Sequence, residues 1–218
     1  MMQRIESIRL SRLLPAVFAG EKLKPSQVWL TELEFQRGNR YLVSAESGAG
    51  KSSLCAFIYG NRTDYQGTIF FNDADIRKYN INEWQELRRR HLAYLPQDLM
   101  LFPELTAIEN IRLKNSLTEG VSEDRIAGWM EELGIDFRRD YPAGKMSVGQ
   151  QQRVAIIRAL CQPFDFLLLD EPVSHLDEEN NRKAAKIIEA RAEELGASII
   201  STSVGNPLLL DNAIRINL

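Results

Sequence analysis

Residues 44–53 read SAESGAGKSS, and this stretch decides the fold. An apolar run, Tyr41–Ala45, leads into it with the pattern of a strand, and a helical pattern follows as far as Gly60. A glycine-rich loop between a strand and a helix offers backbone N–H groups and the positive end of the helix dipole to a phosphate group. Lys51 adds a charge for the β- and γ-phosphates, and the Ser52 hydroxyl can ligate Mg²⁺. The stretch therefore predicts a phosphate-binding loop for a nucleotide.

Ala45 departs from the full pattern of such loops, G-x-x-x-x-G-K-[ST], which begins with glycine. If this position needs a positive φ angle, alanine costs about 1 kcal/mol there and weakens the loop without abolishing it. The alternative interpretation, a glycine-rich turn with an exposed lysine, is disfavoured by the strand before the loop and the helix after it. The residues expected at the phosphates are Ser47, Gly48, Ala49, Gly50, Lys51, Ser52 and Ser53.

A second element that can take part in phosphate chemistry is acidic. The run 164–169 is apolar except for Asp165, which is typical of a strand buried on both faces of a parallel sheet. Asp170 and Glu171 follow at its carboxyl end, where open α/β sheets bind ligands. An aspartate there can hold Mg²⁺, and a neighbouring glutamate can polarise an attacking water. Taken alone, an ordinary acidic strand-to-loop junction is an equal alternative; the phosphate loop makes the functional interpretation the better one.

The remaining pattern alternates strands with helices and predicts an α/β fold. A helical segment over about 98–160 is expected to form an inserted lobe and not a separate domain. The expected strands are Ile5–Leu10, Val28–Phe35, Tyr41–Ala45, Gly67–Phe71, His91–Leu95, Phe164–Leu169, Ala197–Thr202 and an edge strand at Ala213–Leu218. Outside the lobe, the expected helices are the one ending near Gly60, Glu83–Arg90 and Arg182–Leu195.

Composition narrows the function classes. The 218 residues carry a net charge of -3, so nothing argues for nucleic acid as a partner. No apolar run reaches about 18 residues, and Met1–Leu10 lacks the apolar centre of a secretory leader, so we expect a cytosolic chain. Cys55 and Cys161 are predicted to be small core residues. With only two histidines and no cysteine cluster, the sequence argues against a zinc site. The basic run Arg88–Arg90 is expected to be a solvated helix face.

Residues 146–153 read MSVGQQQR and begin another predicted helix. Ser147 and Gln150 have the spacing of a capping box, and Val154, Ile157 and Leu160 follow as a buried face. The Ser147 hydroxyl, the free amides and the positive end of the helix are therefore expected to point outward together. The structural alternative is a helix that is simply well capped.

This segment resembles the LSGGQ signature of ABC-type ATPases, and other motifs of that family follow in the right order. Leu95-Pro96-Gln97 resembles the Q-loop, and Ser174-His175-Leu176-Asp177 resembles the D-loop. Residues 105–110 and 176–180 are most similar to the bacterial lipoprotein-release and macrolide-export subfamily. The resemblance implies one ABC ATPase domain over 1–218, in which a RecA-like core carries a small antiparallel β subdomain and the helical lobe. Because the sequence ends at Leu218, directly after the last expected strand, we expect no regulatory carboxyl-terminal domain.

The resemblance further implies a mechanism. Two copies would pair head to tail, as a homodimer or pseudo-dimer, with each ATP between one phosphate loop and the other copy's signature. The residues implied there are Ser147, Val148, Gly149 and Gln150. Ser52, Gln97 and Asp170 would bind Mg²⁺. The catalytic residues would be Lys51, Gln97 and Glu171. The lobe would dock on a separately encoded membrane permease, which places the chain on the cytoplasmic face of the inner membrane.

Several positions differ from the family pattern. Besides Ala45, Val148 replaces a signature glycine, and Ser203 stands where the family has a switch histidine. His91 and His175 do not fill that role by position and are interpreted as structural or surface residues. Phe18 is the candidate for stacking on adenine, with Leu14 as the competing alignment.

Two functions follow from this pattern. The favoured one is a transporter ATPase that turns over slowly. The other is an ATP-regulated module that controls a membrane partner with little or no hydrolysis, since Ala45, Val148 and Ser203 all belong to the predicted site. A DNA-repair or ribosome-associated ABC ATPase fits less well, because the chain has no long coiled-coil insertion, tandem domain or basic stripe. The transported substrate and its direction belong to the permease.

Overall fold

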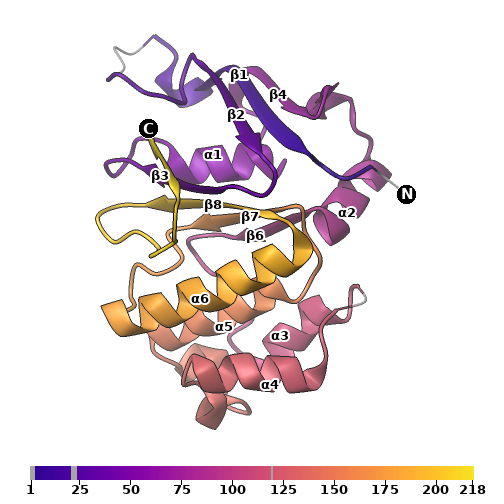
Figure 1. Cartoon of the computed structure of the whole chain (residues 1–218), viewed down its shortest axis with the longest axis vertical. Coiled ribbons are helices and arrows are strands. Elements are labelled where there is room, and N and C mark those ends of the chain that lie inside the picture. The colour runs from indigo at the N-terminus through magenta and orange to yellow at the C-terminus, as the bar shows by residue number, and fades with distance from the viewer. Residues whose placement is uncertain (1–2, 21–23, 119) are drawn as a thin grey trace.

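Two β-sheets and the helices between and below them organise the chain (Figure 1). The computed structural model describes residues 3–20, 24–118 and 120–218; the expectation for Met1–Leu10 therefore lies partly outside the described residues. The antiparallel sheet forms the upper layer, α1 (Lys51–Ile58) lies beneath it, and the parallel sheet forms the middle layer. Helices α3 to α6, which span the chain between Ala107 and Leu195, lie below the parallel sheet, whereas α2 (Ile81–Arg90) lies at its side. The α/β prediction, with an antiparallel subdomain and a helical lobe, is confirmed.

The parallel sheet aligns the carboxyl ends of its strands at one edge. Its strand order is β6-β7-β8-β3-β9. In its register Ser44 faces Ser203, and Thr202 faces Asp170, so the ends of β3, β8 and β7 lie side by side. The predicted burial of β7 on both faces is confirmed at all of its residues. The bounds are β3 Arg40–Ser44, β6 Leu92–Leu95, β7 Phe166–Asp170, β8 Ser198–Ser203 and β9 Ile214–Asn217, with β9 at the edge as expected.

The antiparallel sheet has the order β2-β1-β4-β5. Its bounds are β1 Ser7–Pro15, β2 Glu32–Gln36, β4 Tyr65–Phe71 and β5 Ala74–Asp75. The prediction that a strand begins at Val28 is wrong. The Ser26 hydroxyl accepts hydrogen bonds from the backbone N–H groups of Val28 and Trp29, both at 3.0 Å, and holds this segment in a turn. The strand therefore begins four residues later than its apolar pattern indicated.

Side-chain caps fix where most of the helices begin. Asn80, Thr106 and Ser147 each form a complete capping box with the residue three positions on. The capping box predicted for Ser147 and Gln150 is thereby confirmed. The bounds are α2 Ile81–Arg90, α3 Ala107–Asn115, α4 Glu123–Glu132, α5 Val148–Leu160 and α6 Glu178–Leu195. The segment predicted as the helical lobe contains α3, α4 and α5.

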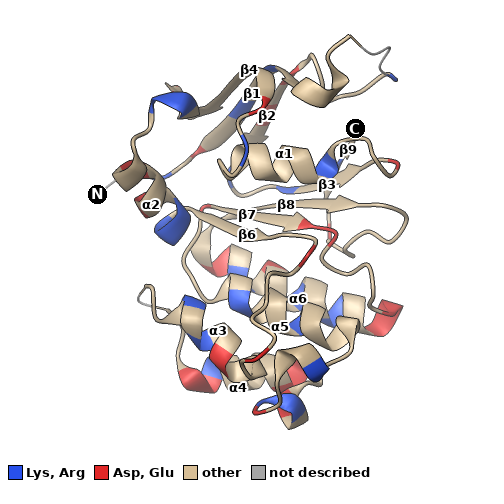
Figure 2. Ribbon diagram, turned by 180° about the vertical axis from the view of Figure 1, so that it is seen from behind, with Lys and Arg blue, Asp and Glu red and all other residues tan. Residues whose placement is uncertain are grey.

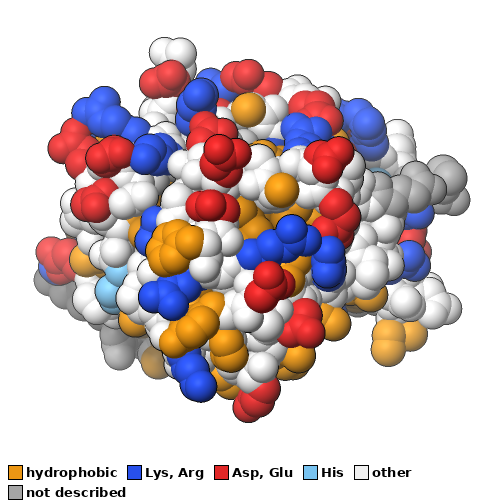
Figure 3. Space-filling view, turned by 90° about the horizontal axis from the view of Figure 1, so that it is seen from below, with side chains coloured by type: hydrophobic (Ala, Val, Ile, Leu, Met, Phe, Trp, Pro, Cys, Tyr) orange, Lys and Arg blue, Asp and Glu red, His pale blue; other side chains and the backbone are white. Residues whose placement is uncertain are grey.

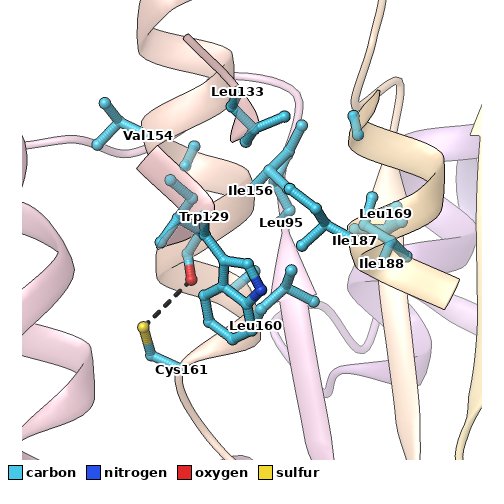
Figure 4. Close-up of a cluster of buried hydrophobic side chains, with 14 of the residues drawn as sticks. Leu95, Trp129, Leu133, Val154, Ile156, Leu160, Cys161, Leu169, Ile187 and Ile188 are labelled. Carbon is cyan, nitrogen blue, oxygen red and sulfur yellow. Dashed lines mark hydrogen bonds between the residues drawn. The ribbon is translucent and has the colours of Figure 1, made fainter. Parts of the chain in front are cut away.

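The parallel sheet separates two hydrophobic cores. The upper core packs α1 between the two sheets, and the lower core packs α3 to α6 against the other face. The lower core contains Trp129 of α4, Leu160 of α5 and Leu169 of β7, with Leu133 directly after α4 (Figure 4). Cys161 directly follows α5, and its thiol donates to the Ile157 carbonyl at 3.2 Å. Each cysteine is buried and free, one in α1 and one here, as predicted for core residues.

The expectation that Arg88–Arg90 form a solvated helix face holds only in part, because the three residues are half-buried and two of them bind carbonyls of other segments. The Arg88 guanidinium donates to the carbonyls of Tyr59 (3.2 Å) and Gly60 (2.9 Å), at the end of α1. Arg89 donates twice to the Leu117 carbonyl, at 3.2 and 2.8 Å. Carbonyl groups at helix ends lack partners within the helix, and guanidinium groups satisfy them. The basic run therefore ties α2 to two other helical segments.

Asp165, the polar exception in the apolar run, lies in a buried polar cluster. Its Oδ2 atom is 2.6 Å from His91 Nδ1 and accepts a hydrogen bond from the Ile5 N–H at 2.9 Å. Arg37 Nε lies 3.6 Å from its Oδ1 atom. His91 is thus a structural residue, as predicted. The cluster lies at the amino end of β7, at the sheet edge opposite the phosphate loop.

We expect Asp165→Ala to lower the free energy of unfolding by about 3 kcal/mol, because it leaves several buried donors without their acceptor. Urea denaturation measures this change. Glu6→Ala, which removes the exposed partner of Arg37, is the control and should cost no more than about 1 kcal/mol. Equal losses in the two variants would contradict the role given to Asp165.

Candidate nucleotide site

The phosphate loop runs from β3 into α1 and contains two glycines in left-handed conformations. Gly48 has φ 81° and Gly50 has φ 97°, which side chains rarely allow. A Cβ atom on Gly50 would lie 2.9 Å from the Trp29 ring and 3.1 Å from the Phe18 ring. Trp29 also donates its indole N–H to the Ala49 carbonyl at 3.0 Å. Two aromatic side chains from outside the loop therefore hold its backbone in place.

Ala45 does not carry the strain that the sequence suggested. Gly48 and Gly50 are the residues of the loop with positive φ, and Ala45 is not among the residues with positive φ in the described chain. Its N–H points to the Ser203 carbonyl at 3.4 Å, so it continues the line of β3 beside β8. The expected cost of about 1 kcal/mol therefore does not apply.

Lys51 and Glu171 meet at the mouth of the loop. The Lys51 ammonium donates to the carbonyls of Glu46 (2.9 Å) and Ala45 (3.5 Å) and lies 3.8 Å from a Glu171 carboxylate oxygen. Its side chain is only 4% exposed. The fold thus brings together two of the predicted catalytic residues from elements 120 positions apart in the sequence.

Acidic residues stand at the carboxyl end of β7 (Figure 2), and Asp170 there is buried. Asp170 accepts a hydrogen bond from the Thr202 hydroxyl at 2.7 Å through one carboxylate oxygen. Its other oxygen is buried without a partner within the described part of the chain. Glu171 has φ 52°, a conformation that is strained for this residue and is common at functional sites. A buried carboxylate oxygen with no donor is available for a ligand.

The oxygen atoms near this edge suit Mg²⁺. The Ser52 hydroxyl lies 3.4 Å from the amide oxygen of Gln97, which is the second residue after β6. Hydroxyl, amide and carboxylate oxygens are the hard ligands that Mg²⁺ prefers, and one or two carboxylates suffice when phosphates supply the rest. Among the described residues no group of three or more His, Cys, Asp and Glu side chains is arranged so that it could hold a metal ion.

A cavity of about 690 Å³ opens beside the phosphate loop. Phe18 lines it, whereas Leu14 is 6% exposed and belongs to the upper core. The competing alignment of Leu14 is therefore not supported by position. Ser203 of β8 and Asn217 of β9 line the cavity from the parallel sheet. Its volume and its position beside the phosphate loop suit a pocket that receives a base.

The amino end of α5 faces outward and contributes no residue to this cavity. Val148 is 48% exposed, and none of Ser147–Gln150 is among the cavity's lining residues. Gly149 packs on the loop that follows β7, where an added Cβ would lie 3.0 Å from the His175 carbonyl. His175 itself is exposed, as predicted, with Nδ1 3.0 Å from the Ser174 hydroxyl.

Gln152 is a site residue that the sequence did not single out. It is 2% exposed and donates to the Ser174 hydroxyl (2.9 Å) and the Glu171 carbonyl (3.4 Å), while its oxygen accepts from the His175 N–H (3.0 Å). It therefore joins α5 to the loop behind Glu171. The sequence could not distinguish it within a run of three glutamines.

Cys55, on α1 behind the loop, is not a reactive group of this site. Burial raises the pKa of its thiol, and the nearby negative charge of Asp170 raises the pKa further. Because the thiolate and not the thiol is the nucleophile, this cysteine remains inert at neutral pH.

The loop, its lysine and the acidic strand end together define an ATP-binding protein of the P-loop class. Comparison with known proteins identifies the family within this class. The family model described as ABC transporter matches residues 30–174. The chain therefore belongs to the ABC transporter family, as an ATP-binding subunit and ATPase.

Relatives agree with this assignment. YbbA of Escherichia coli (strain K12), an uncharacterized ABC transporter ATP-binding protein, is 33% identical over 78% of this chain and 75% of its own length. LolD, the ATP-binding protein of a lipoprotein-releasing system in Francisella tularensis subsp. tularensis (strain FSC 198), is 27% identical over 77% of this chain and 74% of its own. The latter agrees with the resemblance to the lipoprotein-release subfamily.

Solved structures share the fold. The dimeric structure of MJ0796, a bacterial ABC transporter cassette, superposes with a TM-score of 0.76 over 90% of this chain and 87% of that chain, at 24% identity. A structure of the same cassette bound to ADP and Pi gives a TM-score of 0.74 over 90% of this chain and 87% of that chain, at 22% identity.

We expect Ala45→Gly to leave ATP affinity unchanged, because alanine causes no backbone strain there. The added chain entropy should lower the free energy of unfolding by about 0.5–1 kcal/mol. Gly48→Ala is the matched control: its Cβ would meet nothing within 4 Å, so the positive φ alone should weaken ATP binding about fivefold. Titration with ATP measures both. A gain in affinity for Ala45→Gly would show that the loop is strained at Ala45.

Proposed function

We propose that two copies of the chain enclose each ATP, with the phosphate loop of one copy opposite Ser147–Gln150 of the other. The observation that carries this is the outward-facing amino end of α5, which has a capped positive end, an exposed Val148 and no part in its own copy's cavity. A helix amino end attracts anions, and a two-fold operator supplies two equivalent sites. The MJ0796 cassette, which shares this fold, is dimeric in both solved structures.

Within each site the loop binds the phosphates and Phe18 stacks on the adenine. The N–H groups of residues 47–53 surround the phosphates, and Lys51 supplies a positive charge to the β- and γ-phosphates. Phe18 suits the adenine because it lines the cavity beside Gly50. Trp29 supports the loop from the same side through its hydrogen bond to the Ala49 carbonyl.

Ser52, Gln97 and Asp170 would hold Mg²⁺, whose charge compensates that of the transferred phosphoryl group. Glu171 polarises the attacking water from the end of β7. Its backbone N–H is fixed to the Thr202 carbonyl at 3.2 Å, so the carboxylate has a defined direction. Turnover is slow, because the Ser203 hydroxyl is too short to bridge to a γ-phosphate as an imidazole would.

We expect Glu171→Gln to lower ATP turnover at least about a hundredfold while ATP binding persists, because the amide cannot polarise the water. Release of phosphate by the purified chain, with and without its permease, measures turnover. Glu178→Gln, on the exposed start of α6, should retain the wild-type rate. If the wild-type protein binds ATP but never releases phosphate, the chain acts instead as an ATP-regulated module.

An apolar groove next to Gln97 suits the permease. The groove has a volume of about 430 Å³ and lies between the end of β6 and the helical lobe. Met100 (62% exposed), Phe102 (55%), Leu113 (44%) and Leu117 (52%) line it. Viewed from the helical side, hydrophobic side chains appear among charges of both signs (Figure 3). Exposed apolar side chains concentrated in a groove are typical of protein–protein contacts.

A membrane subunit is the occupant that we propose for this groove. No helix in the described ranges is long and apolar enough to cross a membrane. The proposed membrane subunit is a second protein. A helix of that protein would lie in the groove and hold the chain at the cytoplasmic face of the inner membrane. The permease would also determine the transported substrate and its direction.

We expect Leu113→Glu to weaken association with the detergent-solubilised permease of a neighbouring gene at least about tenfold, because the groove would have to bury a charge. Co-purification at graded protein concentrations measures the affinity. Leu209→Glu introduces the same charge at a similarly exposed leucine outside the groove and should bind normally. Equal binding of the permease by the wild type, Leu113→Glu and Leu209→Glu would exclude the groove as the docking site.

A further inference from the structure

The turn immediately after Gln97 has an unusual backbone. Leu99 has φ 58° and Met100 has φ 46°, so two consecutive residues with side chains are in the left-handed region. The Met100 N–H bonds back to the Asp98 carbonyl at 2.6 Å, which closes the turn. Residues other than glycine remain in this region only where surrounding contacts hold them.

Arg158 provides those contacts. From the last turn of α5, its guanidinium donates to the Met100 carbonyl at 2.7 Å and also to the Leu99 carbonyl. The planar guanidinium of Arg158 thus binds the carbonyls of both Leu99 and Met100, which the left-handed conformation directs toward it. Burial lowers the pKa of Arg158 and the nearby Asp98 opposes this, but the guanidinium remains charged at neutral pH.

The segment just before α5 holds the same stretch of chain from its other end. The Gly144 N–H donates to the Pro103 carbonyl at 2.9 Å, and the Ala143 N–H donates to the Leu105 carbonyl at 2.8 Å. A Cβ on Gly144 would lie 2.9 Å from Pro103 Cβ, so the two segments are in close contact. Residues 99–105 are therefore attached to both ends of the helix whose amino end carries Ser147–Gln150.

We propose that Arg158 is a positioning residue for Gln97: it holds the left-handed turn at Leu99 and Met100 and so fixes how the Gln97 amide is presented to Ser52. Because Arg158 belongs to α5, any displacement of that helix moves the turn with it. The position of Gln97 in one site is thereby linked to the helix that reaches the other site. This inference rests on the proposed role of Gln97 at Mg²⁺.

The test separates positioning from general stabilisation. In a Glu171→Gln background, ATP affinity is measured by titration with Mg²⁺ and with EDTA, so that no turnover is required. We expect Arg158→Ala to reduce the Mg²⁺-dependent gain in affinity about tenfold and to leave the affinity in EDTA unchanged. Arg158→Lys should retain part of the gain. Arg89→Ala is the matched control, because it also removes guanidinium bonds to a backbone carbonyl, at Leu117, and should keep the full gain.

Two double variants decide the mechanism. Adding Met100→Gly to Arg158→Ala should restore most of the gain, because glycine adopts the left-handed turn without being held. Adding Arg158→Ala to Gln97→Ala should cause no further loss, because the arginine acts through the glutamine. An unchanged gain in Arg158→Ala, no recovery with glycine, or an additive loss with Gln97→Ala would each overturn the proposal. Phosphate release by wild type and Glu171→Gln tests the proposed hydrolysis separately.

Discussion

The parallel register of β3, β7 and β8 is the constraint on which the rest of the site depends. It places the start of the phosphate loop, the carboxylate of Asp170 and the Ser203 position side by side at one sheet edge. Lys51 and Glu171 meet there although their elements are far apart in the sequence. The opposite edge carries the Asp165 cluster, which secures the sheet away from the chemistry. Stability and function thus occupy opposite ends of the same strands.

Short sequence patterns predicted much of the fold and of the candidate site. The phosphate loop, the burial of β7 and the capping box of Ser147 each depend on residues within a few positions of one another, so the sequence displays them directly. The order of elements then determined the α/β class and the edge where Asp170 and Glu171 lie.

Contacts between distant segments were the part that the sequence could not show. Arg88 looked like a solvated residue because its partners, the carbonyls at the end of α1, are not visible in a pattern of side chains. Gln152 and Arg158 were missed for the same reason, since their partners lie in other loops. The sequence could not show whether Ala45 needs a positive φ angle, because that angle depends on the neighbouring strand.

The aromatic support of the loop has a practical consequence. The chain contains three tryptophans, and they lie in different environments: Trp29 against the phosphate loop, Trp84 on α2 against Phe71 of the antiparallel sheet, and Trp129 in the lower core. Each region therefore carries its own natural chromophore. Light emission from Trp29 can report on nucleotide arrival, and Trp129 on the integrity of the helical lobe, without attaching any label to the protein.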